Sequence, residues 1–400
     1  MNKFLNGRKI LLGITGGIAA YKIPSLVRLL VKSGCEIEII LTPSAENFVT
    51  PMTLATLAKK RVWRENDFIS EGHNIPHIKL SEWADVIAIA PCSANTCAKI
   101  AHGLADNLLT STILAASCPV IIFPAMNEKM FMNKATQLNL KNLSEMGINI
   151  IEPESGDLAC GESGRGRMPE PSEILCELAR ILSPVKNLSG RKVLITTGPT
   201  HEYLDPVRYI SNPSTGKMGV AMARAAWLMG AEVKLISGPV KIDSYGFEVI
   251  NVISAQEMLK AVMQNLSWAD YIVKAAAVGD YRAKEIHSQK IKREGKDSLI
   301  IELVQNPDIA AEVGRNKREN QILIGFAAES ENISHNAREK LSRKNLDYIL
   351  ANDITGQNTG FASDTNILRL IPRDESKSEK IFTGLKQDIA FEIWDYVLSN

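Results

Sequence analysis

The sequence has no excess of either charge. Its 46 Lys and Arg residues nearly balance 45 Asp and Glu residues, so the formal net charge is only +1 over 400 residues. Binding to nucleic acid or to acidic membranes usually rests on a surplus of positive charge. The composition therefore predicts neither as a partner, and ligands have to be inferred from local sites.

Signatures of structural metal sites and of disulfide frameworks are also missing. The six cysteines, at positions 35, 92, 97, 118, 160 and 176, include no C-x-x-C pair. Cys92 and Cys97 have no matching Cys or His pair nearby, and nothing indicates secretion, so neither a zinc site nor a disulfide scaffold is expected. No metal ligand is assigned. All six thiols lie in the first half, so any thiol chemistry belongs there.

Uninterrupted membrane-spanning runs are absent as well. Residues 1–22 place basic residues before an apolar run, but Gly13, Gly16 and Gly17 interrupt it, which favours a strand entering a turn over a secretory signal. Residues 108–126 contain Pro119 and Pro124 and predict a helix, a break and a strand. We therefore expect a cytoplasmic protein without a membrane span.

What the sequence does contain is an alternation of strand-like and helix-like segments, over a length that suggests two domains. In the first half the pattern predicts a helix over 17–34 that ends at Gly34, and strands over 9–15, 36–42, 84–93 and 119–126. Strands separated by helices favour a doubly wound parallel sheet, with ligand loops after the strands.

A Pro, Ser and Gly linker at 182–190 precedes a second opening, "RKVLITTGPT", which echoes residues 8–17. Further strands are predicted over 231–239, 270–278, 321–329 and 346–353. The predicted fold class is α/β, with two Rossmann-like domains at 1–187 and 188–400.

Small polar residues follow the predicted strands of the first half. The turn "GITGGIA" at 13–19 is not GxGxxG and is weak evidence by itself. Thr42 and Ser44 end the second strand, where a dinucleotide-binding protein has Asp or Glu, so FMN is favoured over NAD. Ser93 and Asn95 fit either a ligand loop or a helix cap.

Three further residues have open alternatives. Asn127, after the next strand, can bind a substrate carboxylate or simply form a turn. His77 can be structural or catalytic. Cys160 lies in "LACGESGRGRM" (158–168), which has no apolar periodicity typical of a helix or strand, and it can be a reactive thiol, a disulfide partner or a tolerated residue.

In the second half, "SNPSTGKMG" (211–219) is not a P-loop, because Ser211 replaces Gly and Met218 replaces Ser or Thr. Arg208, Asn212 and Lys217 before a helix starting near Met218 nevertheless suit an anionic phosphorylated ligand, with a solvated loop as the alternative.

Asp280 follows a predicted strand and precedes a basic stretch that contains Lys290. Such a stretch is either solvated surface or a source of charge for a transferring phosphoryl group.

Several motifs in this order, "GGIAAYK", "HIKLSEWADV", "APCSANT", "PAMN" and "ACGESGRGRM", resemble the flavin-dependent cysteine decarboxylases. From about residue 8 to 398, the chain resembles the bacterial bifunctional phosphopantothenoylcysteine decarboxylase/phosphopantothenate-cysteine ligase family of coenzyme A biosynthesis. The resemblance implies a flavodoxin-like, homo-oligomeric flavoprotein domain followed by a CTP-dependent ligase domain.

In such decarboxylases FMN oxidises the cysteine thiol toward a thioaldehyde, which makes loss of the carboxylate possible and finally yields 4'-phosphopantetheine. The resemblance implies that His77 is essential, that Asn127 binds the carboxylate, and that Cys160 donates a proton from a substrate-covering flap. It also implies contacts to FMN from Gly16, Gly17, Thr42, Ser93 and Asn95.

In the ligase half, CTP activates 4'-phosphopantothenate as an acyl-cytidylate, and the amine of cysteine then displaces CMP. By resemblance Asn212 and Arg208 hold this intermediate and Lys290 assists its formation, with Mg²⁺ or a similar divalent cation expected on the triphosphate. The remaining CTP contacts implied are Asp280, Pro307, Asp308, Ile309, Ala310, Phe326, Lys340 and Lys344.

Family relatives form decarboxylase trimers, with flavin sites at subunit contacts, and ligase dimers, which together imply a dodecamer. A non-catalytic flavin-binding protein and an NAD-dependent oxidoreductase are the alternatives. The presence of His77, Asn127 and Cys160 argues against the first, and Thr42 argues against the second.

Overall fold

The computed structural model describes residues 2–68, 75–157, 163–242, 246–292, 299–329, 333–353 and 363–400. Contacts divide the chain into two compact units, Met1–Pro184 and Val185–Asn400, and the sequence predicts domains at 1–187 and 188–400. In the described ranges every helix is too short or too polar to cross a bilayer.

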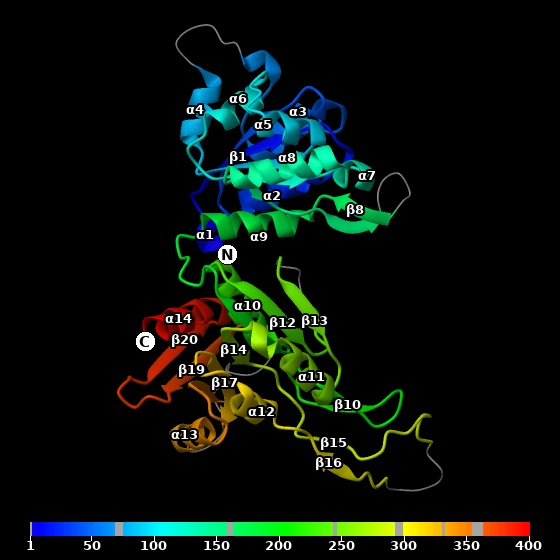
Figure 1. Ribbon diagram of the computed structural model, residues 1–400, viewed down its shortest axis with the longest axis vertical. Helices are drawn as coiled ribbons and strands as arrows, with labels where there is room; N and C mark the ends of the chain where they lie inside the picture. The colour runs from blue at the N-terminus through cyan, green and yellow to red at the C-terminus, as the bar shows by residue number, and fades with distance from the viewer. Residues whose placement is uncertain are drawn as a thin grey trace. The chain divides into compact units, whose positions relative to one another are not determined.

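The first unit is built on a six-stranded parallel sheet in the order β3-β2-β1-β4-β5-β6 (Figure 1). Its strands are β1 (Lys9–Ile14), β2 (Glu36–Leu41), β3 (Val62–Trp63), β4 (Val86–Cys92), β5 (Val120–Pro124) and β6 (Asn149–Ile150). Strand β4 is buried throughout, as expected for a parallel strand with helices on both faces. The predicted α/β class is confirmed.

Helices cover this sheet in two groups. One group packs around α2 and the other around α5 and α6, and the second encloses the apolar cluster that includes Leu109, Ile122 and Leu143. The first group consists of α1 (Asn2–Leu5), α2 (Ile23–Lys32), α3 (Pro51–Ala58) and α9 (Pro171–Leu182); the second consists of α4 (Pro76–Trp83), α5 (Ala94–Ala101), α6 (Leu108–Leu114) and α8 (Lys134–Glu145). Shorter elements are η1 (Ile18–Lys22), η2 (Ala45–Asn47), η3 (Glu65–Asp67) and α7 (Glu128–Phe131).

The helix predicted over 17–34 is wrong in its first turn. Residues Ile18–Lys22 form the 3-10 helix η1, and the α-helix α2 begins only at Ile23. Pro24 explains the break, because proline has no amide hydrogen and is tolerated only in the first turn of an α-helix. Gly34, with φ of +82°, ends the segment as predicted.

A short antiparallel hairpin, β7 (Glu154–Asp157) and β8 (Ser163–Arg167), precedes α9. The sequence predicted no regular structure in 158–168, which is wrong for 163–167. Backbone pairing such as Asp157 with Ser163 holds this strand rather than an apolar alternation. Cys160 lies in residues 158–162, outside the described residues.

The second unit repeats the same strand order and adds to it. Its eight-stranded sheet has the order β13-β12-β9-β14-β17-β18-β19-β20, parallel as far as β18 and antiparallel for the last two strands. The strands are β9 (Lys192–Thr197), β12 (Glu232–Ser237), β13 (Glu248–Asn251), β14 (Tyr271–Lys274), β17 (Ile322–Glu329), β18 (Tyr348–Asp353), β19 (Thr365–Pro372) and β20 (Lys380–Leu385). The sequence predicted β9, β12, β14, β17 and β18, but neither β13 nor the antiparallel pair.

Helices again lie in two groups. On one face α14 packs on α10, where the buried Trp394 Nε1 donates to Met222 O at 3.0 Å. The helices of this face are α10 (Lys217–Leu228) and α14 (Lys386–Ser399); those that contribute to the cluster around Ile272 and Leu323 are α11 (Ala255–Asn265), α12 (Ile309–Asn316) and α13 (Ile333–Arg343), with η4 (Leu266–Trp268) beside them.

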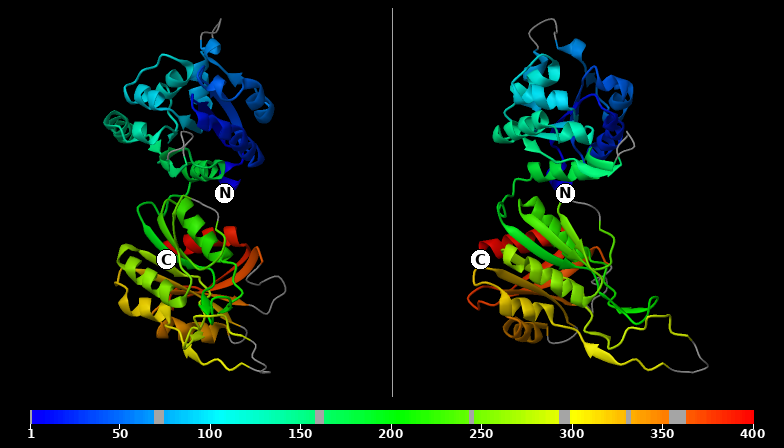
Figure 2. Two further views of the ribbon diagram at one scale, coloured as in Figure 1. Left: turned by 90° about the vertical axis from the view of Figure 1, so that its right-hand side faces the viewer. Right: turned by 45° about the vertical axis from the view of Figure 1, so that its right-hand side comes forward.

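Two hairpins form an arm that extends from this unit (Figure 2). They are β10 (His201–Tyr203) with β11 (Tyr209–Ser211) and β15 (Tyr281–Ala283) with β16 (Leu303–Gln305), and β10 contacts β15. Strand β10 begins four residues after β9 ends, and β15 begins seven residues after β14 ends. The loops at the carboxyl edge of the eight-stranded sheet therefore lead directly into the arm.

A pair of carboxyl groups lies beside the β7–β8 hairpin. Burial and the Glu173 carboxyl raise the pKa of Glu154 from 4.5 to about 7, against the opposing charges of Arg167 and Lys22. Because the pKa is higher in the folded state, this carboxyl favours folding below its ordinary value near 4.5, and that contribution is lost as the pH rises through about 7.

We therefore expect Glu154→Gln to increase the free energy of unfolding at pH 8 by about 1 kcal/mol, a value discounted for solvent screening, and to have little effect at pH 4.5. Calorimetric unfolding of the full chain should show the transition of the first unit about 2–4 °C higher at pH 8. Glu145→Gln, at an exposed position on α8, is the matched control. An equal shift at both pH values would contradict the assignment to Glu154 ionisation.

Candidate active sites

The carboxyl edge of the first sheet opens where its strand order reverses. Strands β1 and β4 are paired neighbours, and the chain leaves them toward helices of different groups. Ligands of doubly wound folds bind in the crevice beyond such a point. Gly16 and Gly17 follow β1, Thr42 follows β2, and Ser93 and Asn95 follow β4, so the five residues predicted to contact FMN come from the loops and the helix start at this edge.

Gly16 allows the loops after β1 and β2 to approach each other closely. A Cβ atom at position 16 would lie 2.5 Å from the Ser44 Cβ and 3.1 Å from the Ser44 carbonyl oxygen. Thr42 also contacts the first strand, because its Oγ1 donates to Ile14 O at 3.1 Å. The two loops are therefore closely packed, and only glycine, which has no side chain, fits at position 16.

Thr15 ties the end of β1 to the loop after β4. Its buried hydroxyl donates to Pro91 O at 2.7 Å and accepts from the Ser93 amide at 2.9 Å. The Ser93 hydroxyl in turn accepts from Thr96 N and caps α5, which is the capping alternative that the sequence left open. Asn95 is exposed in the first turn of α5.

Asn127 lies next to the hairpin that flanks Cys160. It caps the short helix α7, with Oδ1 accepting from Lys129 N at 2.9 Å. Beside it, Met126 N donates to Gly166 O at 3.1 Å, and a Cβ at Gly166 would lie 2.1 Å from Met126 O. Strand β8 therefore packs directly against the loop after β5 that carries Asn127.

His77 lies in the first turn of α4. Its Nδ1 forms no hydrogen bond to these loops among the described residues. Its ring packs near Phe68, with centroids 5.8 Å apart, and its buried Nδ1 has no hydrogen-bond partner in the part of the chain that the structure describes. The sequence predicted an essential histidine, but these contacts do not join it to Asn127 or to the glycine turn.

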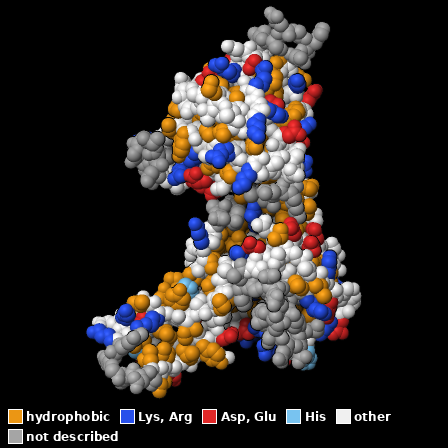
Figure 3. Space-filling view, turned by 180° about the vertical axis from the view of Figure 1, so that it is seen from behind, with side chains coloured by type: hydrophobic (Ala, Val, Ile, Leu, Met, Phe, Trp, Pro, Cys, Tyr) orange, Lys and Arg blue, Asp and Glu red, His pale blue; other side chains and the backbone are white. Residues whose placement is uncertain are grey.

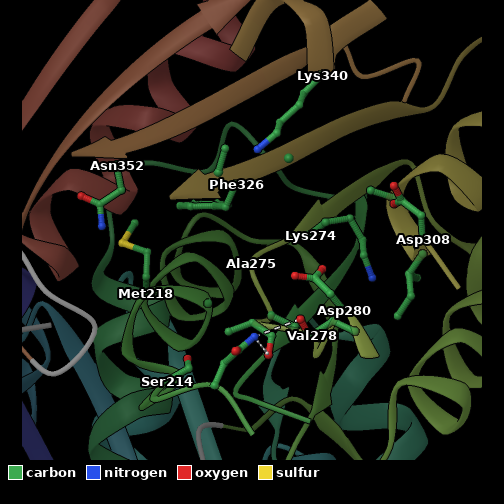
Figure 4. Close-up of a pocket in the computed structure, with 18 of the residues that line it drawn as sticks. Ser214, Met218, Lys274, Ala275, Val278, Asp280, Asp308, Phe326, Lys340 and Asn352 are labelled. Carbon is green, nitrogen blue, oxygen red and sulfur yellow. Dashed lines mark hydrogen bonds between the residues drawn. The ribbon is translucent and has the colours of Figure 1, made fainter. Parts of the chain in front are cut away.

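In the second unit, a pocket of about 650 Å³ opens beyond the edge where β9 and β14 are neighbours (Figure 4). It is lined by nine residues that the sequence predicted: Asn212, Asp280, Pro307, Asp308, Ile309, Ala310, Phe326, Lys340 and Lys344. In Figure 4, Lys274 and Asp308 lie on one side of the pocket, opposite Asn352 and Met218. The pocket thus joins segments from positions 212 to 344 at one sheet edge.

Two of these side chains are held firmly. Asn212 Nδ2 donates to Val278 O at 3.0 Å and to Ala277 O at 3.4 Å, which fixes its amide on the wall formed by the loop after β14. Asp308 caps α12 and forms an ion pair with Lys344 at 3.0 Å. Burial favours a higher pKa for Asp308, but the Ala311 amide and Lys344 together hold its pKa below the ordinary value.

Arg208 and Lys290 do not line the pocket in this structure. Arg208 Nη1 lies 3.2 Å from both Asp205 Oδ2 and Ile291 O, and the Ile291 amide donates to the same carboxylate oxygen at 3.1 Å. Lys290 is exposed next to this anchor. The buried Asp205 carboxylate therefore links the turn that carries Arg208 to the segment that carries Lys290.

Lys274 lines the same pocket and was not among the residues predicted from the sequence. The strand segment "DYIVKAAAV" contains this single cation among apolar residues, a signal that could have drawn attention to it. Within the described residues, no group of three or more His, Cys, Asp or Glu side chains could hold a metal ion.

Each unit matches a known protein family. Residues 2–183 match the family described as Flavoprotein, and residues 188–400 match the one described as DNA/pantothenate metabolism flavoprotein C-terminal domain. With a doubly wound sheet in each unit and a match to a flavoprotein family in each, the chain is a two-domain flavoprotein.

Full-length relatives define the family more closely. The coenzyme A biosynthesis bifunctional protein CoaBC of Haemophilus influenzae is 45% identical over 392 residues, covering 97% of this chain and 98% of the relative. The protein of the same name from Bacillus subtilis is 44% identical over 393 residues, covering 97% and 96%. This chain belongs to that family of bifunctional coenzyme A biosynthesis proteins.

The Thr15 bridge predicts a difference between two conservative changes. Thr15→Val leaves the Ser93 amide without its acceptor and the Pro91 carbonyl with only the Thr15 backbone amide at 3.3 Å, and should cost about 2 kcal/mol of unfolding free energy, with weaker flavin retention. Thr15→Ser keeps the hydroxyl and should retain both properties. Denaturant unfolding and the visible flavin spectrum of the purified proteins measure the two effects, and equal behaviour of Val and Ser variants would contradict the bridge.

Proposed function

We propose that the second unit ligates cysteine to 4'-phosphopantothenate at the expense of CTP, and that the first unit decarboxylates the resulting 4'-phosphopantothenoylcysteine to 4'-phosphopantetheine using FMN. The observation that carries the ligase assignment is the pocket that collects Asn212, Asp280, Asp308, Lys340 and Lys344. The product of the second unit is the substrate of the first, which accounts for both activities in one chain.

In the ligase step, the carboxylate of 4'-phosphopantothenate attacks the α-phosphate of CTP, and pyrophosphate leaves. The amine of cysteine then attacks the acyl carbon, and CMP leaves as the amide forms. Asn212, fixed on the pocket wall, and Arg208 would hold the acyl-cytidylate, while Lys340 and Lys344 offset the charge of the triphosphate. Mg²⁺ or a similar divalent cation would shield that charge further.

Lys290 would assist formation of the acyl-cytidylate. Its neighbour Ile291 is bound to the Asp205 carboxylate, which also holds Arg208, so the two cations are carried by segments with a common anchor. Because Asp205 holds both segments, Arg208 and Lys290 would act together in forming the acyl-cytidylate, although neither lines the pocket.

The ligase assignment is tested by incubating the protein with 4'-phosphopantothenate, cysteine, CTP and Mg²⁺ and identifying the products by mass. We expect 4'-phosphopantetheine, CMP, pyrophosphate and carbon dioxide. Lys290→Gln should lose acyl-cytidylate formation by about 100-fold or more yet still decarboxylate added 4'-phosphopantothenoylcysteine, since loss of one transition-state charge contact costs about that much. Normal ligase turnover by this variant would contradict the role of Lys290.

The residues at the first edge fit FMN. The turn at Gly16, which packs too closely on Ser44 for a side chain, and the start of α5 lie at this edge, and a glycine turn beside a helix start is an arrangement that binds phosphates. Gly16, Gly17, Thr42, Ser93 and Asn95 would hold the cofactor. When bound, FMN supplies the acceptor for the electron pair of the substrate thiol, and that chemistry makes the carboxylate a leaving group.

The chain's own side chains would place the substrate and move protons. Asn127 would bind the substrate carboxylate beside the β7–β8 hairpin, and Cys160 would protonate the enethiolate that remains after carbon dioxide is lost. His77 would act in the same reaction, and its buried Nδ1 has no hydrogen-bond partner among the described residues.

A homo-oligomer, with a dodecamer built from trimers and dimers as the expected form, is part of this proposal. In the first unit Ile18 and Tyr21, directly after the Gly16–Gly17 turn, are 57% and 63% exposed. In the second unit apolar side chains gather on the arm (Figure 3), namely Val207, Tyr209, Ile210, Tyr281, Ile286 and Leu303. Exposed apolar patches of this kind support subunit contacts.

Cys160→Ser provides a separate test of the decarboxylase. We expect the variant to release carbon dioxide from 4'-phosphopantothenoylcysteine but to stall at the oxidised enethiol, with bound flavin left reduced and bleached in the visible spectrum. Cys118→Ser, which alters a half-buried thiol outside the proposed site, is the matched control and should turn over normally. Full formation of 4'-phosphopantetheine by Cys160→Ser would exclude this thiol as the proton donor.

A further inference from the structure

Lys274 ends β14 at the edge of the ligase pocket and is buried there. The residue is 7% exposed, and its Nζ has no hydrogen-bond partner among the described residues. Because side chains alternate along a strand, Lys274 shares a face with Ile272, which belongs to the apolar cluster of α11, α12 and α13. The amine therefore lies where the apolar core meets the pocket.

Few charges face this amine. Asp308 on α12 is the acid that acts on it, and this carboxylate is already engaged by the Ala311 amide and Lys344. The neighbouring strands place Thr196 and Gly325 opposite Lys274. On α11, Glu257 and Lys260 are neighbours in sequence of the buried residues Met258 and Ala261, but both charged residues are exposed.

The pocket as a whole carries more positive than negative charge. Its lining includes six cationic side chains, Lys217, Lys274, Lys340, Arg343, Lys344 and Lys386, against the two acids Asp280 and Asp308. Some of these cations have acidic partners, such as Lys217 with Asp364 at 2.7 Å and Lys344 with Asp308. Lys274 differs because the protein supplies no acceptor for its ammonium group within the described residues.

A buried cation without an acceptor is costly, and most such groups either find a partner or lose their proton. Burial lowers the pKa of Lys274 from 10.5 to about 7, with the charge of Asp308 opposing the shift. An anionic group placed within hydrogen-bonding distance would stabilise the ammonium form and restore a higher pKa.

We propose that Lys274 is a phosphate-binding residue of the ligase site, whose ammonium group donates a hydrogen bond to a phosphate oxygen of a bound substrate. The inference rests on the ligase function proposed above and adds a residue to it. CTP and 4'-phosphopantothenate both carry such oxygens, so the shared chemistry is the phosphate and the experiment has to separate the two sources.

Binding through this residue has a defined pH dependence. The free protein loses the Lys274 proton as the pH rises through about 7, whereas the complex keeps it. Binding at pH 8 must therefore take up a proton, and the affinity for the phosphate ligand must fall as the pH rises above about 7.

The test is calorimetric titration of the full-length protein at pH 8 with CTP and Mg²⁺, and separately with 4'-phosphopantothenate, in buffers of different ionisation enthalpy. We expect proton uptake by the wild type and about tenfold weaker binding by Lys274→Met, equivalent to one charge-assisted hydrogen bond, with the uptake lost. Methionine matches the buried stem without a charge, so the unfolding midpoint should not fall. Lys260→Met, at an exposed position on α11, should behave as wild type.

The outcomes separate the two hypotheses. A loss confined to CTP assigns the contact to the triphosphate, and a loss confined to 4'-phosphopantothenate assigns it to that substrate's phosphate. Wild-type protein that takes up no proton with either ligand, or a Lys274→Met variant with unchanged affinities, overturns the inference even if methionine disturbs folding slightly. Wild-type protein that binds neither ligand and forms no product contradicts the ligase function itself.

Discussion

The strand order of the two sheets obliges the chain to open a crevice at the same place in each unit. Strand β1 pairs with β4, and β9 pairs with β14, while the intervening crossovers pass to helices of different groups. Right-handed crossovers that leave adjacent strands toward opposite faces leave the edge between them uncovered. The glycine turn, the Ser93 loop and the loop that holds Asn212 all lie at these two edges. Backbone topology thus positions both sites before any catalytic side chain is considered.

A buried lysine connects the two parts of the proposed decarboxylase site. Lys22, at the end of the 3-10 helix that follows the Gly16–Gly17 turn, donates to Met168 O at 2.8 Å and to Glu170 Oε1 at 2.9 Å. Met168 directly follows β8, so the segment after the Gly16–Gly17 turn is bound to the end of the hairpin that flanks Cys160. One buried side chain therefore holds together the segment after β8 and the segment after the Gly16–Gly17 turn.

The parts of the fold that the sequence predicted are those with strong apolar patterns. Strands such as β4 and β9 are nearly continuous runs of buried residues, and the parallel α/β class follows from their alternation with helices. Strand β20 was missed because only Phe382 in it is buried, and β8 was missed because Gly and Arg residues there pair through backbone alone. Lys274 was missed for the opposite reason, since an apolar strand segment masks a cation whose importance depends on three-dimensional burial. The roles of His77 and Cys160 came from resemblance, and no local pattern would have assigned them.

The two buried lysines illustrate how a ligand site differs from a structural contact. Lys22 and Lys274 are both less than a tenth exposed, but Lys22 has a carbonyl and a carboxylate as acceptors, whereas Lys274 has none among the described residues. Both amines lose their hydration on folding, and the protein compensates this loss only for Lys22. Without a ligand Lys274 avoids this cost by losing its proton as the pH rises through about 7, and on the inference above a group that enters the pocket supplies the compensation. A buried amine without a protein acceptor at the carboxyl edge of a parallel sheet therefore favours, under this proposal, a ligand group of negative charge, because only such a group stabilises the ammonium form.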